Sequence, residues 1–229
     1  YDTWLEVRRR APRIVVLTGG PGVGKTTLIN AIFSTCQMEG AVVARAQAYD
    51  AERELPFAGL GELVKQLTIQ RAIGSAEPEV LSELSRITAE IFAVFPGVPK
   101  PVEWSAEVMP LRLADAFLKA VTAAAEESPV VLVVDDIHAA DNASAAILHV
   151  VARKLAGTRV LLVLAGRSSE LHTAAAPAAL TADTTIQGMR TLEVDVLSAE
   201  ASARLVAQLA AEGAERLGDP PAERILHAG

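Results

Sequence analysis

A short stretch with four glycines, a lysine and two threonines has the residue types and order needed to bind a phosphate chain. Residues 19–27 read Gly-Gly-Pro-Gly-Val-Gly-Lys-Thr-Thr and match the P-loop (Walker A) pattern G-x-x-x-x-G-K-[ST]. Glycines let the backbone wrap closely around an anion, so that successive N–H groups point inward. We therefore expect a nucleotide to contact Gly19, Gly20, Gly22, Val23, Gly24, Lys25, Thr26 and Thr27.

The end of a second apolar run supplies the acidic side chains that a nucleotide site needs. Residues 130–134 read Val-Val-Leu-Val-Val and lead directly into Asp135 and Asp136, a Walker B pattern. Lys25 would place its charge near the β- and γ-phosphates, and Thr26 and Asp135 would hold Mg²⁺. Asp136 would orient or deprotonate the water that attacks the γ-phosphate. The two motifs together predict a site for Mg²⁺ and ATP or ADP.

Three more polar residues follow strands that should end at the same edge. Arg167 comes directly after the apolar run 160–165, and a guanidinium there would sense the γ-phosphate, so we place it with Lys25 and Asp136 among the catalytic residues. His138 is either a tuning residue near the γ-phosphate or a loop histidine, and both alternatives stay open. Asp141 precedes a helical pattern, which favours a helix N-cap over direct ligand contact.

The elements that must position these residues alternate between strand and helix. We expect strands at 13–18, 41–46, 130–135, 159–165 and 191–195, helices at about 25–38, 56–70, 78–94, 110–127 and 142–156, and an irregular stretch at 172–188. Alternation of this kind is typical of βαβ units. The predicted fold is a three-layer α/β P-loop NTPase with a mostly parallel central sheet.

The chain changes character after its last predicted strand. Ser198 is a plausible helix cap, and helices at 200–212 and 220–228 have no strand between them. We therefore expect an ATPase core at 1–196 and the beginning of a helical lid at 197–229, cut off before it can close a core of its own. Tyr1–Arg10 reads as the tail of a helix that has no start signal, which suggests a piece of a longer chain.

Composition excludes some classes of partner. The chain has 229 residues, a net charge of −7, 51% hydrophobic residues and one cysteine. An acidic balance argues against a nucleic-acid-binding surface in this segment, and no apolar run is long enough to cross a membrane. A single cysteine rules out an internal disulfide and fits a reducing compartment, so we expect a cytoplasmic location.

Four segments together resemble a known family. They are GGPGVGKTT, ARAQAYDAERELPFAGLGELV, VVLVVDDIHAADNASAAILHVVARKL and VLLVLAGRSSE. Over roughly residues 11–228 the chain looks like the ATPase module of the STAND branch of AAA-type P-loop NTPases, and it is most similar to the module that opens large LuxR-type bacterial transcriptional regulators. The resemblance implies an ADP/ATP switch that self-associates in the ATP form, with DNA bound only through a helix-turn-helix domain that this sequence does not contain.

Departures from that pattern limit what the resemblance implies. The family's adenine-cradling segment is missing before Tyr1, a Gly-Asn-Pro motif is missing after Gly229, and Ala139 stands where the family commonly has tryptophan. The leading expectation is a weakly hydrolysing regulatory ATPase. A small-molecule kinase or other turnover ATPase, and an AAA-type DNA-replication loader core, remain as alternatives. No guanine-recognition motif is present, which disfavours GTP.

Overall fold

A parallel β-sheet forms the centre of the molecule. The computed structural model describes residues 2–11, 13–204 and 206–207, and its internal contacts divide the chain into two units, 1–194 and 195–229. In the described part of the first unit the sheet has five parallel strands in the order β2-β3-β4-β1-β5. These are β1 (Arg13–Gly19), β2 (Val42–Gln47), β3 (Val130–Asp135), β4 (Val160–Arg167) and β5 (Met189–Glu193).

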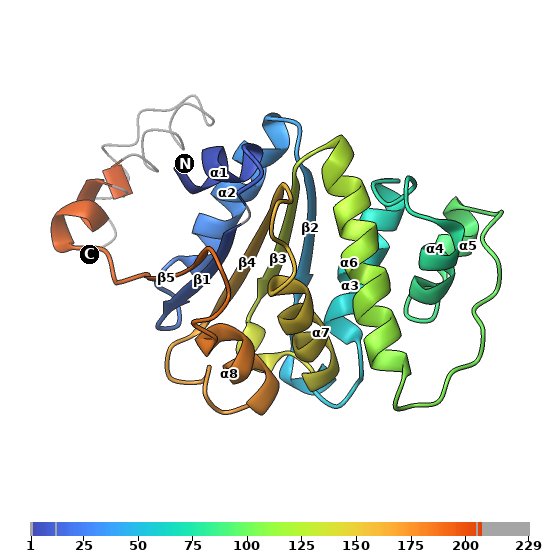
Figure 1. Cartoon of the computed structure of the whole chain (residues 1–229). Helices are drawn as coiled ribbons and strands as arrows, with labels where there is room; N and C mark the ends of the chain where they lie inside the picture. The colour runs from blue at the N-terminus through green and yellow to red at the C-terminus, as the bar shows by residue number, and fades with distance from the viewer. Residues whose placement is uncertain (1, 12, 205, 208–229) are drawn as a thin grey trace, which may run out of the picture. The chain divides into compact units, whose positions relative to one another are not determined.

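Helices cover both faces of this sheet, and alternate residues of β1, β2, β3 and β4 are buried on opposite sides, whereas β5 is mostly exposed. One face packs against α1 (Asp2–Arg8) and α2 (Lys25–Met38). The core on the other face is shared by α3 (Ala58–Ile69), α6 (Met109–Glu127), α7 (Asn142–Ala152) and α8 (Ala175–Ala182). Figure 1 shows the sheet between these two groups. The predicted three-layer α/β fold is therefore confirmed, with every strand pairing in the described sheet parallel.

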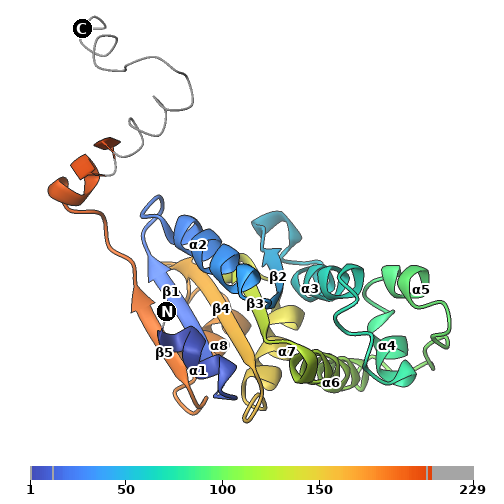
Figure 2. The same cartoon turned by 90° about the horizontal axis from the view of Figure 1, so that it is seen from above.

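The free edge of β2 is protected by two glutamine side chains, Gln66 of α3 and Gln70 directly after that helix. Gln66 Nε2 donates to the Arg45 carbonyl at 2.7 Å, and Gln66 Oε1 accepts from the Arg45 N–H at 2.8 Å. One helical turn later, Gln70 Nε2 donates to the Val43 carbonyl at 2.9 Å. An edge strand otherwise exposes unpaired backbone groups that recruit other chains. Figure 2 shows α3 beside β2, with α4, α5 and α6 on the same side of the sheet.

The helix expected at 78–94 is wrong, because the segment forms two helices. They are α4 (Pro78–Leu84) and α5 (Glu90–Val94), separated by a turn at residues 85–89. The hydroxyl of Thr88 donates to the Glu90 carboxylate at 2.6 Å within that turn. α4 packs against α6 whereas α5 packs against α3, and one straight helix could not reach both partners.

The stretch expected to be irregular at 172–188 contains α8. Its sequence, Ala-Ala-Pro-Ala-Ala-Leu-Thr-Ala, lacks the polar face that marks a surface helix, so its periodicity gave no signal. α8 packs against α7 and buries Leu180 completely. The following strand, β5, spans Met189–Glu193 and thus begins two residues earlier than the expected 191–195.

The second unit begins with a helical turn at the place expected. Residues 199–204 are helical, and Ser198 Oγ accepts a hydrogen bond from the Ala201 N–H at 3.2 Å, which confirms Ser198 as a cap. The rest of the helix expected at 200–212 lies largely outside the described residues, and the helix expected at 220–228 lies entirely outside them. The start of a helical lid stays a prediction. In the part of the chain that is described, no helix is both long and apolar enough to cross a membrane.

Candidate nucleotide site

The glycine-rich loop joins β1 to α2 and is shaped by positive backbone angles. Gly22 and Gly24 have φ of 74° and 101°, which residues with a side chain rarely adopt, and Gly24 is the N-cap of α2. Lys25, the first residue of α2, is only 8% exposed. Its Nζ donates to the Gly19 carbonyl at 3.0 Å and to the Gly20 carbonyl at 2.7 Å. The lysine charge therefore lies over the loop, where phosphate oxygens could replace these carbonyls as its partners.

The first glycine of the loop is required by a close backbone approach. A Cβ atom on Gly19 would lie 2.4 Å from the Val194 carbonyl oxygen. The Val194 N–H donates to the Thr18 carbonyl at 2.7 Å, which holds the end of β5 against the end of β1. The start of the loop thus depends on a strand far away in the sequence.

Thr26, at the start of α2 after β1, meets Asp135 at the end of β3. The two strands are not neighbours, because β4 lies between β1 and β3. The Thr26 hydroxyl donates to Asp135 Oδ2 at 3.0 Å, and the Asp135 side chain is almost completely buried. A hydroxyl and a carboxylate are hard oxygen donors, which Mg²⁺ prefers when phosphate oxygens and water complete its shell. The two side chains therefore fit the metal predicted for them. The described residues contain no cluster of three His, Cys, Asp or Glu side chains suited to a metal on its own.

Two polar residues of β2 also reach the acidic pair, and sequence reasoning missed both. An Nη of Arg45 lies 2.6 Å from Asp135 Oδ2, and Gln47 Nε2 donates to Asp136 Oδ2 at 2.7 Å. β2 pairs with β3 so that Gln47 is opposite Asp135. The available signal was the polar pair at positions 45 and 47, which share one face of a strand that is otherwise apolar.

Asp136, the residue directly after β3, lies in the left-handed backbone region, with φ 53° and ψ 43°. Its N–H donates to Asp135 Oδ1 at 3.1 Å. A non-glycine residue in this region is strained by about 1–2 kcal/mol, and such strain clusters at functional sites. The sharp turn lets the two consecutive carboxylates take different partners, Asp135 inside the sheet and Asp136 at its rim.

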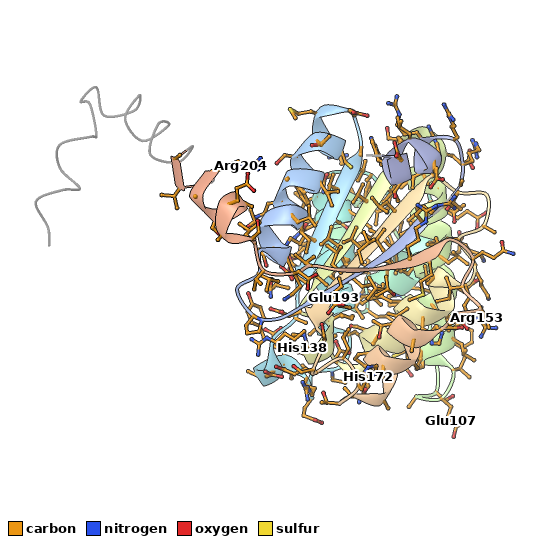
Figure 3. The ribbon with its side chains drawn as sticks, turned by 90° about the vertical axis from the view of Figure 1, so that its left-hand side faces the viewer. Glu107, His138, Arg153, His172, Glu193 and Arg204 are labelled. Carbon is orange, nitrogen blue, oxygen red and sulfur yellow. The ribbon has the colours of Figure 1, made fainter. Side chains whose placement is uncertain are left out.

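His138 and Arg167 belong to a network centred on Glu170. The His138 side chain is buried, its Nδ1 accepts from the Arg167 N–H at 3.4 Å, and its Nε2 lies 3.3 Å from Glu170. An Nη of Arg167 donates to Glu170 at 2.8 Å, and this bond keeps the pKa of Glu170 below its usual value. Figure 3 labels His138 at the lower end of the strands. Among the described contacts, Arg167 is paired with Glu170 and does not bond the side chains of the loop.

Asp141 is a helix cap, as its position predicted, and it caps two helices at once. Its Oδ1 accepts from the Ser144 N–H of α7 at 2.8 Å and from the Phe57 N–H, at the start of α3, at 2.9 Å. Ser144 Oγ in turn accepts from the Leu60 N–H at 2.9 Å. The loop after β3 is therefore tied to the segment after β2.

Of the predicted site residues, the structure brings Lys25, Thr26, Asp135 and Asp136 to one edge of the sheet. Arg167 lies beside the loop, because it pairs with Gly19 in the strand register. Its guanidinium, however, is paired with Glu170. Contacts with a nucleotide stay predictions for the loop residues Gly19, Gly20, Gly22, Val23, Gly24, Lys25, Thr26 and Thr27. A glycine-rich loop with a buried lysine therefore lies next to hydroxyl and carboxylate oxygens.

Comparisons with known proteins find several similar solved structures and one matching family. One solved structure, Drosophila ORC bound to DNA, is 15% identical with a TM-score of 0.49 and covers 90% of this chain and 43% of that chain. A Signal Transduction ATPase with Numerous Domains (STAND) protein with a tetratricopeptide repeat sensor, from Pyrococcus horikoshii, is 14% identical with a TM-score of 0.47 and covers 96% and 28% respectively. The chain thus spans less than half of either protein.

VirB4 of Thermoanaerobacter pseudethanolicus is 13% identical with a TM-score of 0.37, covering 85% of this chain and 80% of that one. The search of curated proteins finds no match. The family model described as "AAA ATPase domain" matches residues 2–163, which include the glycine-rich loop and the acidic pair. Since this match spans well over half of its length, the chain belongs to the AAA ATPase domain family.

Proposed function

We propose that this chain binds Mg-ATP at residues 19–27 and hydrolyses it slowly, as the regulatory switch module of a multidomain transcriptional regulator. One observation carries the nucleotide part of the proposal: the Thr26 hydroxyl lies 3.0 Å from the buried Asp135 carboxylate, directly beside Lys25. A loop that only turned the chain would not need these groups to converge. Phosphate, metal and lysine charges balance one another only when they are brought together.

Each group has a separate task in this proposal. Lys25 exchanges its two loop carbonyls for oxygens of the β- and γ-phosphates, and the N-terminus of α2 adds its partial positive charge. Thr26 and Asp135 hold Mg²⁺, which when bound neutralises charge on the phosphates. Asp135 is well placed for this task, because its buried carboxylate lies at hydrogen-bond distance from the Thr26 hydroxyl and the two present oxygen ligands together.

Slow hydrolysis follows from the position of Asp136. As the water-orienting carboxylate it is one methylene shorter than a glutamate, so its reach is limited. Gln47 already donates to its Oδ2 at 2.7 Å, so one of the two carboxylate oxygens is engaged by an amide before any water binds. We propose that Arg167 senses the γ-phosphate by leaving Glu170, its present partner. A slow rate of ATP hydrolysis suits a regulatory timer better than a mechanical motor.

The switch itself requires contacts beyond the core. Shifting a two-state equilibrium from 1:99 to 99:1 needs ATP and ADP to differ in affinity for the two states by about 10⁴-fold. We propose residues 1–196 as the ATPase core and 197–229 as the beginning of the lid that supplies part of this difference. Self-association in the ATP form and DNA binding through a separate domain rest on the resemblance of the four segments to LuxR-type regulators. The proposed cytoplasmic location rests on the single cysteine, Cys36.

The nucleotide part is tested by Lys25→Ala. ATP with Mg²⁺ at 100 times its dissociation constant should stabilise the unchanged protein by about 2.7 kcal/mol, seen as a rise in melting temperature. Lys25→Ala should abolish that rise. The matched control is Lys119→Ala on α6, whose lysine is exposed and paired with Asp115. An equal ATP-dependent shift in the Lys25 and Lys119 variants would refute the assignment of the loop.

The regulatory part is tested by the rate of ATP turnover and by the domains that the complete coding sequence encodes. Turnover well below the typical enzyme range of about 1–10³ s⁻¹ is expected for a switch. Fast ATP consumption that depends on a small acceptor would instead identify a kinase. The complete coding sequence should contain a helix-turn-helix domain, and its absence would contradict the transcriptional role.

A further inference from the structure

The Arg45 guanidinium already binds Asp135, the carboxylate that the proposed Mg²⁺ would also contact. The guanidinium is held from both sides, by Asp135 at 2.6 Å and by Asn30 Oδ1 of α2 at 2.7 Å. The Arg45 side chain is 26% exposed, whereas that of Asp135 is 2% exposed. Because a buried carboxylate is costly without a counter-ion, the Arg45 guanidinium offsets that cost at Asp135 when no metal is bound.

A single oxygen of Asp135 makes both of the hydrogen bonds that bear on metal binding. Asp135 Oδ2 accepts from Arg45 and also from the Thr26 hydroxyl at 3.0 Å. A divalent cation or its bound water placed between Thr26 and Asp135 would need that oxygen. It would also lie close to the guanidinium, and like charges at such a distance repel strongly in a poorly solvated site.

We propose that Arg45 is a built-in counter-ion for Asp135 that the Mg²⁺–nucleotide complex must displace, so that nucleotide binding is coupled to a movement of this side chain. The inference rests on the proposed metal role of Asp135. Arg45 acts through Asp135 and is therefore a positioning residue. Its effect is to raise the Mg²⁺ concentration at which nucleotide binds.

The structure provides a place for the displaced guanidinium. A polar cavity of about 650 Å³ opens beside β2, and Arg45 itself lines it together with Gln47, Glu52, Glu62 and Gln66. Two of these side chains are carboxylates that can accept a guanidinium. The backbone of Arg45 is fixed by Gln66 through both its N–H and its carbonyl, so the side chain can move while the strand edge stays closed.

The test measures how nucleotide binding depends on Mg²⁺. ADP affinity is determined by calorimetry over a series of Mg²⁺ concentrations for the unchanged protein and for Arg45→Met, which keeps the apolar stem and removes the charge. We expect the Mg²⁺ concentration for half-maximal binding to fall about tenfold in Arg45→Met, equivalent to about 1.4 kcal/mol. Without Mg²⁺ this variant should also melt at a lower temperature, and Mg²⁺ alone should restore more of that loss than in the unchanged protein.

Two further variants keep the test decisive if Arg45→Met folds poorly. Asn30→Ala removes the outer partner of the guanidinium at an exposed helix position and should shift the Mg²⁺ requirement in the same direction by about twofold, since one hydrogen bond is lost. Arg45→Lys keeps the charge but cannot bond Asn30 and Asp135 together, so its shift should be intermediate.

The possible failures are distinguishable. If the unchanged protein binds ADP without any dependence on Mg²⁺, or does not bind it, the proposed function fails. If the unchanged protein shows Mg²⁺-dependent binding while Arg45→Met needs as much Mg²⁺ or more, the inference about Arg45 alone is overturned. Weaker ADP binding by Arg45→Met at saturating Mg²⁺ would also overturn it, because Arg45 would then be a direct ligand of the nucleotide.

Discussion

The glycine-rich loop and the acidic edge of the site are built in different ways. The loop is one continuous run, residues 19–27, whose shape is set mostly by its own glycines and by the start of α2. The acidic edge is assembled from separate segments: Asp135 and Asp136 follow β3, while Arg45 and Gln47 come from β2. A ligand that bridges the two regions must therefore join a local structure to one that exists only when the sheet is complete.

This difference predicts that mutations in the two regions should affect nucleotide binding and packing differently. A change in the loop should affect nucleotide binding directly. A change at the acidic edge should act through packing as well, because its loops are tied together by shared hydrogen bonds. Asp141 is the clearest example, since one carboxylate caps both α7 and α3.

The largest expected effect is that of Gly19→Ala, which tests how local the loop really is. Its Cβ would lie 2.4 Å from the Val194 carbonyl oxygen, a backbone atom that can yield only if β5 shifts. We expect a loss of about 3 kcal/mol in the free energy of unfolding, measured by urea titration, together with loss of ATP binding.

The matched control is the next residue. A Cβ on Gly20 would meet only the Val23 side chain at 3.7 Å, an ordinary contact, so Gly20→Ala should change stability by less than about 0.5 kcal/mol. Equal effects of the two substitutions would show that the contact with Val194 does not constrain the loop.

A somewhat smaller effect is expected from Asp141→Ala at the acidic edge. The buried N–H of Ser144 and the half-buried N–H of Phe57 would lose their acceptor, at a cost of about 2 kcal/mol in unfolding free energy. Asp141→Asn retains one oxygen for both bonds and should cost less than about 1 kcal/mol. If the alanine variant unfolds at the same urea concentration as the unchanged protein, the joint cap does not stabilise this edge.

The smallest effect, at Asp183, provides a reference outside both regions. Hydrogen bonds from His149 and then Thr185 hold the pKa of Asp183 well below its usual range. Because the folded pKa is lower than the unfolded value, the stabilisation is present above about pH 4 and is lost as the pH falls further. The stability difference between the unchanged protein and Asp183→Asn should therefore be larger at pH 7 than at about pH 3. A difference that does not change with pH would contradict this.

The sequence predicted the local features well and the assembled ones poorly. The loop, β3 with its carboxylates and the cap at Asp141 follow from short patterns that carry their own physical reason. The break between α4 and α5 depends on which helices each half contacts, and α8 has no polar face to reveal it. Arg45 acquires its partner only when β2 pairs with β3, a neighbour far away in the chain.

The central claim is that the two carboxylates have separate tasks, Asp135 with the metal and Asp136 with the attacking water. Asp136→Ala tests it most directly, by measuring ATP binding through the melting shift and hydrolysis through single-turnover release of phosphate. The account predicts that Asp136→Ala binds Mg-ATP as the unchanged protein does while hydrolysis falls at least about 10²-fold. Parallel loss of binding and hydrolysis would contradict it.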